Sequence, residues 1–439
     1  MTLSAVRLRR PGSTALLVLT LAASALLAAH LPAATGVGSW PQWHGPNRDN
    51  LSAATGLLQQ WGPNGPNLAW RATGLGAGFS SLAITQDHIY TMGDQGEDQY
   101  VLALPASGGK IVWKTRIGAA WDDEYPGPRG TPTLDGDVLY AIGTDGDLVC
   151  LDTATGKERW RRSLARDFGG FVMSGWKYAE SPLIDGNKLI VTPGGRNATL
   201  VALDKTTGKE LWRSAVPSFG SAGRDGAGYS SIVISEGAGV RQYVQLLGRG
   251  VVGIRASDGK FLWGYDRVAN GVANISTPLV TGDYVFASTG YGTGSGLLKL
   301  TKEGDGVKAT EVYFLDGRTF QNHHGGFVFV NNHIYGGHGQ SNGFPICIEL
   351  TSGQVKWGGN IRGAGSGSAA VTYAENHLYF RYQDGTIALI EATPTGYQLK
   401  GSFRLPNVNI PSWSHPVVLD GKLYLREQDT LYVYNIKRA

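Results

Sequence analysis

The chain has 439 residues, is rich in glycine (64 residues) and in aromatic side chains (10%), and carries charge on only 17% of its residues. Such apolar and aromatic content excludes a disordered chain, because enough side chains are available to fill a core. Without residues 1–34, which hold three arginines and no acidic residue, 36 basic and 35 acidic side chains remain, and this near neutrality gives no electrostatic case for nucleic acid or an anionic membrane as a partner.

Residues 1–34 have the pattern of a secretory leader. Three arginines precede the apolar run ALLVLTLAASALLAAHL, and the small residues PAATG follow it. That order predicts a signal peptide cleaved near Ala33 or Ala34, and therefore a periplasmic or secreted protein. An uncleaved membrane anchor stays an alternative, although the apolar run is near the lower limit of about 17 residues for a membrane span.

An eleven-residue phrase recurs along the chain. ALDKTTGKELW (Ala202–Trp212) nearly repeats CLDTATGKERW (Cys150–Trp160), and fainter copies end at other tryptophans. The tryptophans at positions 70, 113, 160, 212 and 263 are 43, 47, 52 and 51 residues apart, and the next anchor, at 357, follows after 94 residues. The last step equals two periods with one degenerate repeat between them. Repeats of this length indicate a solenoid or a propeller.

Each repeat has the pattern of four strands. TPTLDGDVLYAIGTDGDLVCLD (131–152) alternates apolar and polar residues and contains Asp-Gly at 135–136 and 145–146. This is a hairpin signal, because glycine supplies the positive φ that a tight turn needs. A Thr-Gly-Lys turn and a last strand ending in tryptophan complete four antiparallel strands, which make one propeller blade.

The sequence therefore predicts an all-β protein, a single eight-bladed β-propeller of four-stranded antiparallel blades over residues 35–439. The predicted blades cover residues 79–118, 130–165, 180–217, 228–267, 275–315, 323–362, 366–405 and 413–436. The last has only three strands, and PNLAWRATG (Pro66–Gly74) resembles an outer strand without its partners. We expect this N-terminal strand to complete the last blade and close the ring. Seven blades is the alternative count.

The recurring tryptophan is predicted to join neighbouring blades. Glycine allows the turn, and the indole can lie flat against the next blade, burying about 150–250 Å². Regular spacing favours this structural role over ligand stacking for Trp70, Trp113, Trp160, Trp212, Trp263 and Trp357. Cys150 and Cys347 occupy equivalent positions in two well-separated blades, so they are predicted to be buried free thiols.

The pattern Ala-x-Asp-x-x-Thr-Gly-Lys-x-x-Trp, matched fully by residues 202–212, resembles the tryptophan-docking motif of the quinoprotein (pyrroloquinoline quinone, PQQ) propeller repeat. The likeness covers residues 40–436. Two groups carry this repeat: the periplasmic PQQ-dependent dehydrogenases, and non-enzymatic propellers that include the lipoprotein assisting outer-membrane barrel assembly. WPQWHGPNRDNLS, YPGPRGTPTLDGD, YAESPLIDG and NHHGGFVFVNNHIYG further look like a bacterial family of secreted PQQ-like propellers.

The chain departs from the dehydrogenase pattern at two points. Those enzymes typically have adjacent cysteines that form a disulfide ring over the cofactor, and this chain has no Cys-Cys pair. GYGTGSG (Gly290–Gly296) resembles their Gly-Thr-Gly-Asn stretch, but Ser295 replaces the asparagine at a calcium site. Because Ca²⁺ prefers six to eight oxygen ligands, we expect a non-catalytic binding or scaffold protein, with no cofactor assigned. A PQQ-dependent alcohol or sugar dehydrogenase, holding PQQ and Ca²⁺ near Glu180, Asn274 and Arg129, is the alternative.

The loops that lead into the inner strand of each predicted blade, here called axial loops, open on one face of the ring. Their candidate ligand-binding residues are Arg129, Trp176, Tyr178, Glu180, Tyr229, Asn274, His323, His324, Trp413 and His415. Arginine can hold a carboxylate bidentately, aromatic rings can stack on a flat ligand, and a glutamate or histidine can exchange a proton. Such convergence predicts a ligand pocket at the axis. For any one of them, a structural role at a blade end is the alternative.

The remaining sequence features leave the partner open. No His-x-x-x-His, Cys-x-x-Cys or phosphate-binding loop occurs, and neighbouring residues such as His323 and His324 point to opposite faces of a strand, so no metal site is predicted. The acidic loop Gly118–Gly130 is expected to cover one face of the ring. The partner is a protein, a polysaccharide or a small molecule, and a monomer is expected. The segment Trp40–Asn50 either plugs the channel or packs on the rim.

Overall fold

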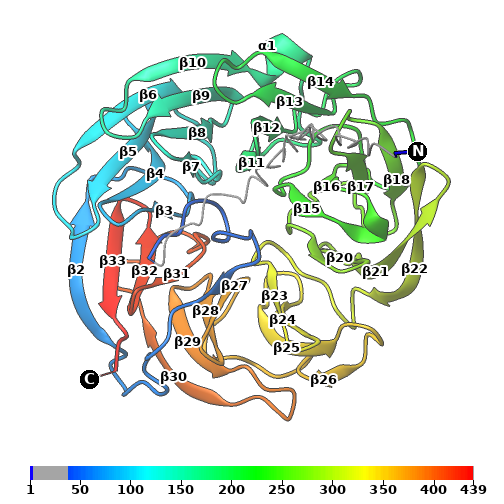
Figure 1. Cartoon of the computed structure of the whole chain (residues 1–439). Coiled ribbons are helices and arrows are strands. Elements are labelled where there is room, and N and C mark those ends of the chain that lie inside the picture. The colour runs from blue at the N-terminus through cyan, green and yellow to red at the C-terminus, as the bar shows by residue number, and fades with distance from the viewer. Residues whose placement is uncertain (3–37, 439) are drawn as a thin grey trace. The chain divides into compact units, whose positions relative to one another are not determined.

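The computed structural model describes residues 1–2 and 38–438. Within 38–438, eight antiparallel sheets follow one another around a central axis, which confirms the predicted eight-bladed propeller (Figure 1). The predicted signal peptide lies outside the described residues, apart from the first two, and stays a prediction. No helix within the described part of the chain has the length and hydropathy that crossing a membrane requires.

The first four blades follow the chain from the inner to the outer strand. Blade one contains β3 (Ala83–Ile84), β4 (His88–Gln95), β5 (Asp98–Pro105) and β6 (Trp113–Ala119). Blade two contains β7 (Thr133–Asp135), β8 (Val138–Ile142), β9 (Asp147–Asp152) and β10 (Glu158–Ser163), and the short helix α1 (Leu164–Phe168) follows it. Blade three contains β11 (Leu183–Asp185), β12 (Lys188–Val191), β13 (Leu200–Asp204) and β14 (Glu210–Ser214). Blade four contains β15 (Val233–Ser235), the 3₁₀ turn η1 (Gly237–Gly239), β16 (Gln242–Leu247), β17 (Gly250–Arg255) and β18 (Phe261–Tyr265).

The last four blades continue the same order around the ring. Blade five contains β19 (Leu279–Thr281), β20 (Tyr284–Thr289), β21 (Gly294–Glu303) and β22 (Gly306–Asp316). Blade six contains β23 (Phe327–Val330), β24 (His333–His338), β25 (Phe344–Glu349) and β26 (Val355–Trp357). Blade seven contains β27 (Ala369–Ala374), β28 (His377–Tyr382), β29 (Thr386–Glu391) and β30 (Leu399–Arg404). Blade eight contains β31 (Val417–Leu419), β32 (Lys422–Glu427) and β33 (Thr430–Asn435), with β2 (Asn67–Thr73) as its outer strand.

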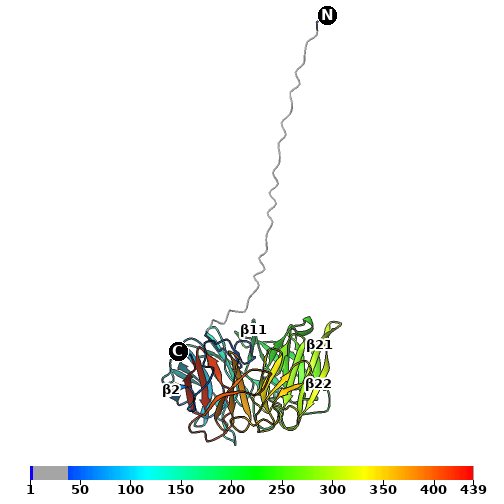
Figure 2. The ribbon, with the colours of Figure 1, turned by 90° about the horizontal axis from the view of Figure 1, so that it is seen from below.

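Strand burial explains the sequence pattern of each blade. Middle strands such as β8 are buried along their whole length, because blades cover both of their faces. Outer strands such as β14 alternate between half-buried and exposed residues, because one face meets solvent. Figure 2 shows the blades from the side, with strands such as β21 and β22 running between the two faces of the ring.

The ring is closed by strands from opposite ends of the chain. As predicted, β2 completes blade eight: it pairs antiparallel with β33. Trp70 lies opposite Val433 in this pair. Closure removes the open edge that the last blade would otherwise present to other strands. One strand was not predicted: β1 (Leu51–Ser52) pairs parallel with β27 as a fifth, innermost strand of blade seven. The buried thiols Cys150 and Cys347 are both free, as expected.

Neighbouring blades meet where a tryptophan covers a turn. The indole Nε1 of Trp160 in blade two donates to the carbonyl of Lys205 in blade three at 3.1 Å. Its ring lies on Gly208 in the same turn, where a Cβ would come within 2.8 Å of the indole. Trp113 makes the same contact with Gly156 of the following blade. We call these turns between third and fourth strands docking turns. The motif glycine is therefore needed for space as well as for its positive φ.

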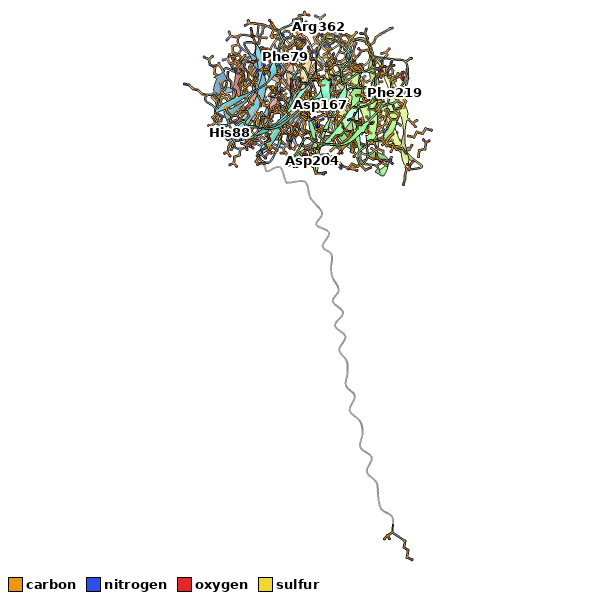
Figure 3. The ribbon with its side chains drawn as sticks, turned by 90° about the horizontal axis from the view of Figure 1, so that it is seen from above. Phe79, His88, Asp167, Asp204, Phe219 and Arg362 are labelled. Atoms are coloured by element: carbon orange, nitrogen blue, oxygen red, sulfur yellow. The ribbon has the colours of Figure 1, made fainter. Side chains whose placement is uncertain are left out.

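The degenerate repeat has a tyrosine in place of the docking tryptophan. Tyr313 lies opposite Leu297 in blade five, the position that the tryptophan holds in other blades, and its hydroxyl donates to the carbonyl of Leu350 in blade six at 2.7 Å. Blade five therefore makes the docking contact with a phenol ring in place of an indole. In Figure 3, Asp204 of a docking turn lies towards one face of the ring, and Phe79 of an axial loop lies towards the other.

Replacing the docking glycine is expected to cost more than backbone strain alone. Gly208→Ala adds a methyl group against Trp160 at a φ of +69°, whereas Gly136→Ala adds one at +62° with no atom within 4 Å. The strain, about 1–2 kcal/mol, is common to both variants, and overpacking adds about 1–3 kcal/mol only to Gly208→Ala. Urea unfolding of both variants measures the difference. Equal losses of stability would contradict docking by this contact.

Candidate functional site

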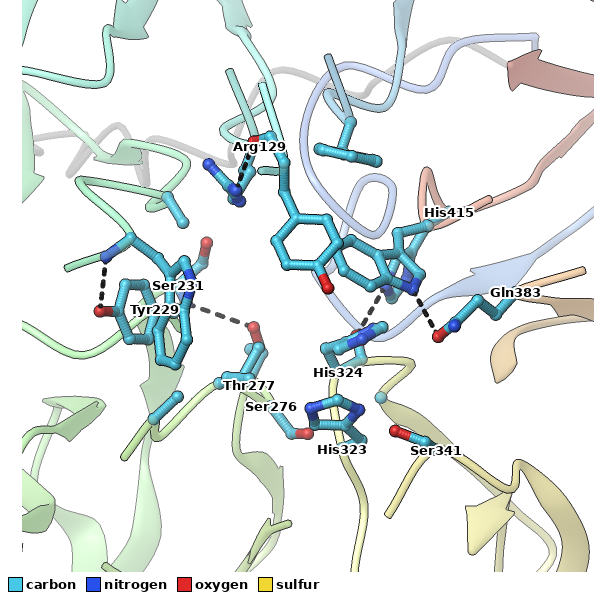
Figure 4. A pocket seen from close by; sticks show the side chains of 18 of the residues that line it. Arg129, Tyr229, Ser231, Ser276, Thr277, His323, His324, Ser341, Gln383 and His415 are labelled. Carbon is cyan, nitrogen blue, oxygen red and sulfur yellow. Dashed lines mark hydrogen bonds between the residues drawn. The ribbon is translucent and has the colours of Figure 1, made fainter. Parts of the chain in front are cut away.

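A cavity of about 400 Å³ opens at one mouth of the propeller axis (Figure 4). Its walls come from the axial loops, from the loops that join the second and third strands of blades five to seven, and from the segment Trp40–Asn50. Rings dominate the lining, which includes Trp43, Phe79, Tyr125, Trp176, Tyr229, Tyr291 and Trp413. A cavity of this size with a few polar groups among apolar walls is typical of small-ligand sites.

The segment Trp40–Asn50 crosses the channel and does not pack on the rim. Its first residue pairs through the backbone with Ile84 of blade one, and its last bonds to the carbonyl of Val371 in blade seven. Between them, the guanidinium of Arg48 donates to the carbonyl of Ser181 at 2.6 Å. In Figure 1 this dark blue stretch runs through the middle of the ring towards β27. We call it the plug.

The plug supplies the base of the cavity. The ring of Trp43 stacks on His44 with centroids 4.0 Å apart, and its Nε1 donates to Thr277 Oγ1 at 3.2 Å. His44 Nε2 lies 3.0 Å from Nδ1 of His415, which comes from the axial loop of blade eight. These bonds hold the rings of Trp43 and His44, which lie outside the repeats, against the axial loops of blades five and eight.

Seven of the ten residues selected from the sequence lie on the cavity wall. They are Arg129, Trp176, Tyr229, His323, His324, Trp413 and His415. Tyr178 and Asn274 lie outside it. The hydroxyl of Tyr178 donates to the carbonyl of Pro193 at 2.8 Å, and the amide of Asn274 donates to the carbonyl of Leu247 at 3.0 Å. Both side chains tie the axial loops to the blades.

Glu180 is also outside the cavity, buried behind its wall with 3% exposure. One carboxylate oxygen accepts from the backbone N–H of Thr192 and the other from its hydroxyl, each at 2.7 Å. Burial raises the pKa of Glu180 to about 7, against the effect of these bonds and of the charge of Arg48. The residue anchors the start of blade three.

Arg129 is a cation held by rings and backbone. Its guanidinium carbon lies 4.3 Å from the centroid of Trp121 and 5.5 Å from that of Phe79. Nη2 donates to the carbonyl of Tyr125 at 2.8 Å, and Nη1 reaches that of Gly127 at 3.4 Å. No carboxylate of the described residues forms an ion pair with it. Burial lowers the pKa of Arg129 to about 10, so it stays charged at neutral pH.

The histidines of the cavity are neutral at neutral pH. Burial lowers the pKa of His323 and of His415 to about 4. The amide of Gln340 lies 3.1 Å from His323 Nε2, and since amide nitrogen only donates, Nδ1 carries the proton and donates to Ser368 Oγ at 2.7 Å. The hydroxyl of Tyr291 also lies 3.1 Å from His323 Nε2.

A buried ion pair fixes the loop that carries Trp413. Arg381 bonds to Glu427 at 2.8 Å, to Ser412 Oγ at 3.0 Å and to the carbonyl of Ser414 at 2.8 Å, so both neighbours of Trp413 are held. The indole N–H of Trp413 donates to Gln383 Oε1 at 2.9 Å. This wall of the cavity is therefore preorganised.

Left-handed backbone also gathers at the cavity. His44, Tyr291 and Ser341 line it with φ of 61°, 57° and 56°. For a residue as bulky as tyrosine this conformation is a genuine outlier, and such strain clusters at functional sites. Sequence reasoning missed Tyr291 and named the plug residues only as a segment. The aromatic pair within WPQWHG, outside any repeat, was the one available signal.

The residues present do not fit calcium-bound PQQ. Among the described residues of the cavity wall, the one carboxylate is Glu124, which is exposed, while Glu180 and Asn274 bond within the protein. Ser295 is buried inside blade five, where its hydroxyl contacts Ser288 Oγ at 2.8 Å. Among the described residues, no group of three His, Cys, Asp or Glu side chains is placed to hold a metal ion. A hard cation would lack the oxygen ligands that it prefers.

The fold, the docking turns and the axial cavity together define a PQQ-like β-propeller. A family model described as "Outer membrane protein assembly factor BamB" matches residues 97–359, from blade one to blade six. The chain belongs to this family. It is related both to BamB proteins and to quinoprotein dehydrogenases.

Two curated relatives and one solved structure illustrate the breadth of the likeness. BamB of Kangiella koreensis is 24% identical over 52% of this chain and 50% of its own length, and quinoprotein ethanol dehydrogenase of Pseudomonas aeruginosa is 25% identical over 52% and 40%. The chain thus spans half or less of these relatives. Quinohemoprotein alcohol dehydrogenase of Comamonas testosteroni superposes with a TM-score of 0.61 at 13% identity, covering 92% of this chain and 81% of that one, which shows the shared fold alone.

Glu180→Gln is expected to change how stability depends on pH. The folded-state pKa is about 7 and the unfolded value is about 4.3, so the folded protein holds the extra proton between them. Stability of the wild type relative to the variant therefore falls as pH rises from about 4.5 to about 7, and is constant above that. Urea unfolding at four pH values between 5 and 8 measures this.

The exposed Glu97 provides the matched control. Glu97→Gln should change the stability little, because an exposed side chain away from partners contributes little to folding. The buried histidines affect all three proteins alike and cancel in the comparison. A difference between wild type and Glu180→Gln that does not vary with pH would show that Glu180 is ionised throughout.

Proposed function

We propose that this protein is an exported, non-catalytic PQQ-like propeller that binds a small molecule in the axial cavity. The observation that carries the proposal is the composition of that cavity: many ring side chains, an arginine that pairs with no carboxylate of the described residues, and neutral histidines. Aromatic walls bind by stacking and exclusion of water, and they need no cofactor to do so.

Export is part of the proposal. The leader pattern of residues 1–34 supports it, and so does the similarity to proteins named as outer-membrane assembly factors. A periplasmic or secreted location agrees with two free thiols that are buried and far apart in the ring, where oxidation cannot join them.

A PQQ-dependent dehydrogenase is the second candidate, favoured by the similarity to quinoprotein ethanol dehydrogenase over half of the chain. PQQ would supply a two-electron acceptor for alcohol oxidation. Among the described residues of the wall, however, the one carboxylate is the exposed Glu124, and the amide oxygens of Gln340 and Gln383 already accept hydrogen bonds from Tyr291 and Trp413. The donor set therefore favours the binding protein.

Ring compounds are expected to bind the mature protein and to quench its tryptophan fluorescence. Trp176 is half-buried on the wall and meets another ring only edge-on, at Tyr229. Trp176→Leu should weaken binding about 10-fold, because base–aromatic or ring stacking contributes about 1–3 kcal/mol. Titration of a fragment library of neutral and charged ring compounds measures the affinities.

Phe171→Leu is the control, because Phe171 is exposed and lies outside the cavity wall. It should leave binding unchanged. If no ring compound binds the wild type at millimolar concentration, the cavity is not a ligand site and the proposal fails.

PQQ separates the two candidates. Equilibrium dialysis of PQQ with and without CaCl₂, followed by dye reduction over mixed alcohols and sugars, should show no calcium-dependent binding and no turnover. Tight calcium-dependent binding together with dye reduction would establish the dehydrogenase instead.

A further inference from the structure

A cation that forms no ion pair with any described carboxylate lies on the cavity wall. Of the five N–H donors of a guanidinium, two bonds of Arg129 go to backbone carbonyls, of Tyr125 and Gly127, and the described residues offer no further acceptor. The rings of Trp121 and Phe79 cover its faces. Figure 4 shows the group directed into the space between the loops. Its remaining donors are thus available to something inside the cavity.

Nearby acidic groups act on this charge from a distance and do not contact it. Asp94 and Asp123 act on Arg129 electrostatically, but neither forms an ion pair with it. The oxygens of Asp94 instead accept from Gln99 Nε2 and from the N–H of Trp121, each at 2.8 Å. Glu124 is exposed at the rim. The cavity histidines are neutral, so they neither add a positive charge nor balance one.

The number of charges indicates the class of anion. A single guanidinium matches the two oxygens of one carboxylate. Among the described residues of the wall, no second arginine and no lysine is present. A phosphate, with close to two negative charges, would leave part of its charge buried without a partner.

A second polar anchor lies across the cavity. His324 Nε2 is buried and has no hydrogen-bond partner within the described structure. The charge of Arg129 reaches this ring, because it contributes to lowering the pKa of His324. Both residues line the same cavity. An unpartnered imidazole nitrogen in an otherwise bonded site is satisfied by a ligand or by water.

We propose that the axial cavity binds a ring-shaped monocarboxylate, with the carboxylate on Arg129, the ring against Trp176, and a polar group on His324 Nε2. This inference rests on the proposed function and names the class of ligand. The volume of about 400 Å³ accommodates one or two rings. Aromatic carboxylates and uronic acids share this chemistry.

Two pairs of probes test the class and its source. 1-Naphthoate is compared with 1-naphthamide, and methyl glucuronide with methyl glucoside, by calorimetric titration of the full mature protein. The acid of at least one pair should bind about 10- to 100-fold more tightly than its neutral partner, the range expected for a charged hydrogen-bonded pair. Preference in the first pair alone identifies aromatic acids, and preference in the second pair alone identifies uronic acids.

Arg129→Gln should abolish the preference, bringing acid and neutral probe within about threefold of one another. Arg129→Lys should restore part of it, because the charge returns without the bidentate geometry. Arg166→Gln, which removes a charge from the exposed end of α1, should leave the preference intact. Thermal unfolding of each variant checks that it is folded.

The outcomes separate this inference from the proposed function. Equal binding of acid and neutral probes, or an acid preference that survives Arg129→Gln, would overturn the carboxylate class while leaving a ligand-binding cavity. Failure of every probe, together with failure of the wider fragment library, would overturn both.

Discussion

The contact between an indole and a turn glycine is the constraint on which this structure depends. Trp160 lies on Gly208 and donates to the carbonyl of Lys205 in the same turn. Trp70, Trp113 and Trp212 lie in the same way on glycines of the blades that follow theirs. Trp263 does not make this contact, because its indole N–H donates to Gln242 of its own blade. A flat ring on a residue without Cβ sets a short, fixed distance between blades. That distance decides how far apart the axial loops stand on the opposite face, and so how wide the cavity is.

The N-terminal part of the described chain has two roles in this arrangement. β2 completes blade eight, and the plug supplies Trp43 and His44 to the base of the cavity. The cavity is therefore a property of the closed ring and not of any one blade. Its walls are held from behind by buried polar groups: Glu180 and Asn274 tie down axial loops, and Arg381 holds the loop of Trp413.

The fold could be predicted from the sequence because the sequence patterns that define it are local. The Asp-Gly turns and alternating strands lie within single repeats, and the tryptophan recurs once in most of them. Tyr313 could not be found by this pattern, because a tyrosine makes the docking contact there in place of a tryptophan. The site was reached in part. Whether an axial-loop residue faces the cavity or the blade depends on the backbone conformation of an irregular loop, which the sequence pattern does not define. For this reason Tyr178, Glu180 and Asn274 were selected from the sequence although they lie outside the cavity wall. His44 was missed because the plug belongs to no repeat, and its contacts come from blades distant in sequence.

Closure of the ring by β2 and β33 imposes an order of events on a newly made chain. Because β2 precedes its partner β33 and seven blades lie between them in the chain, the edge of β2 stays unpaired while those blades form. Until that late pairing, neither the complete ring nor a fully walled cavity exists. Ligand binding in the cavity would then require that the ring has closed. A chain that has not yet closed the ring would expose an unpaired strand edge, which proteases and chaperones can recognise.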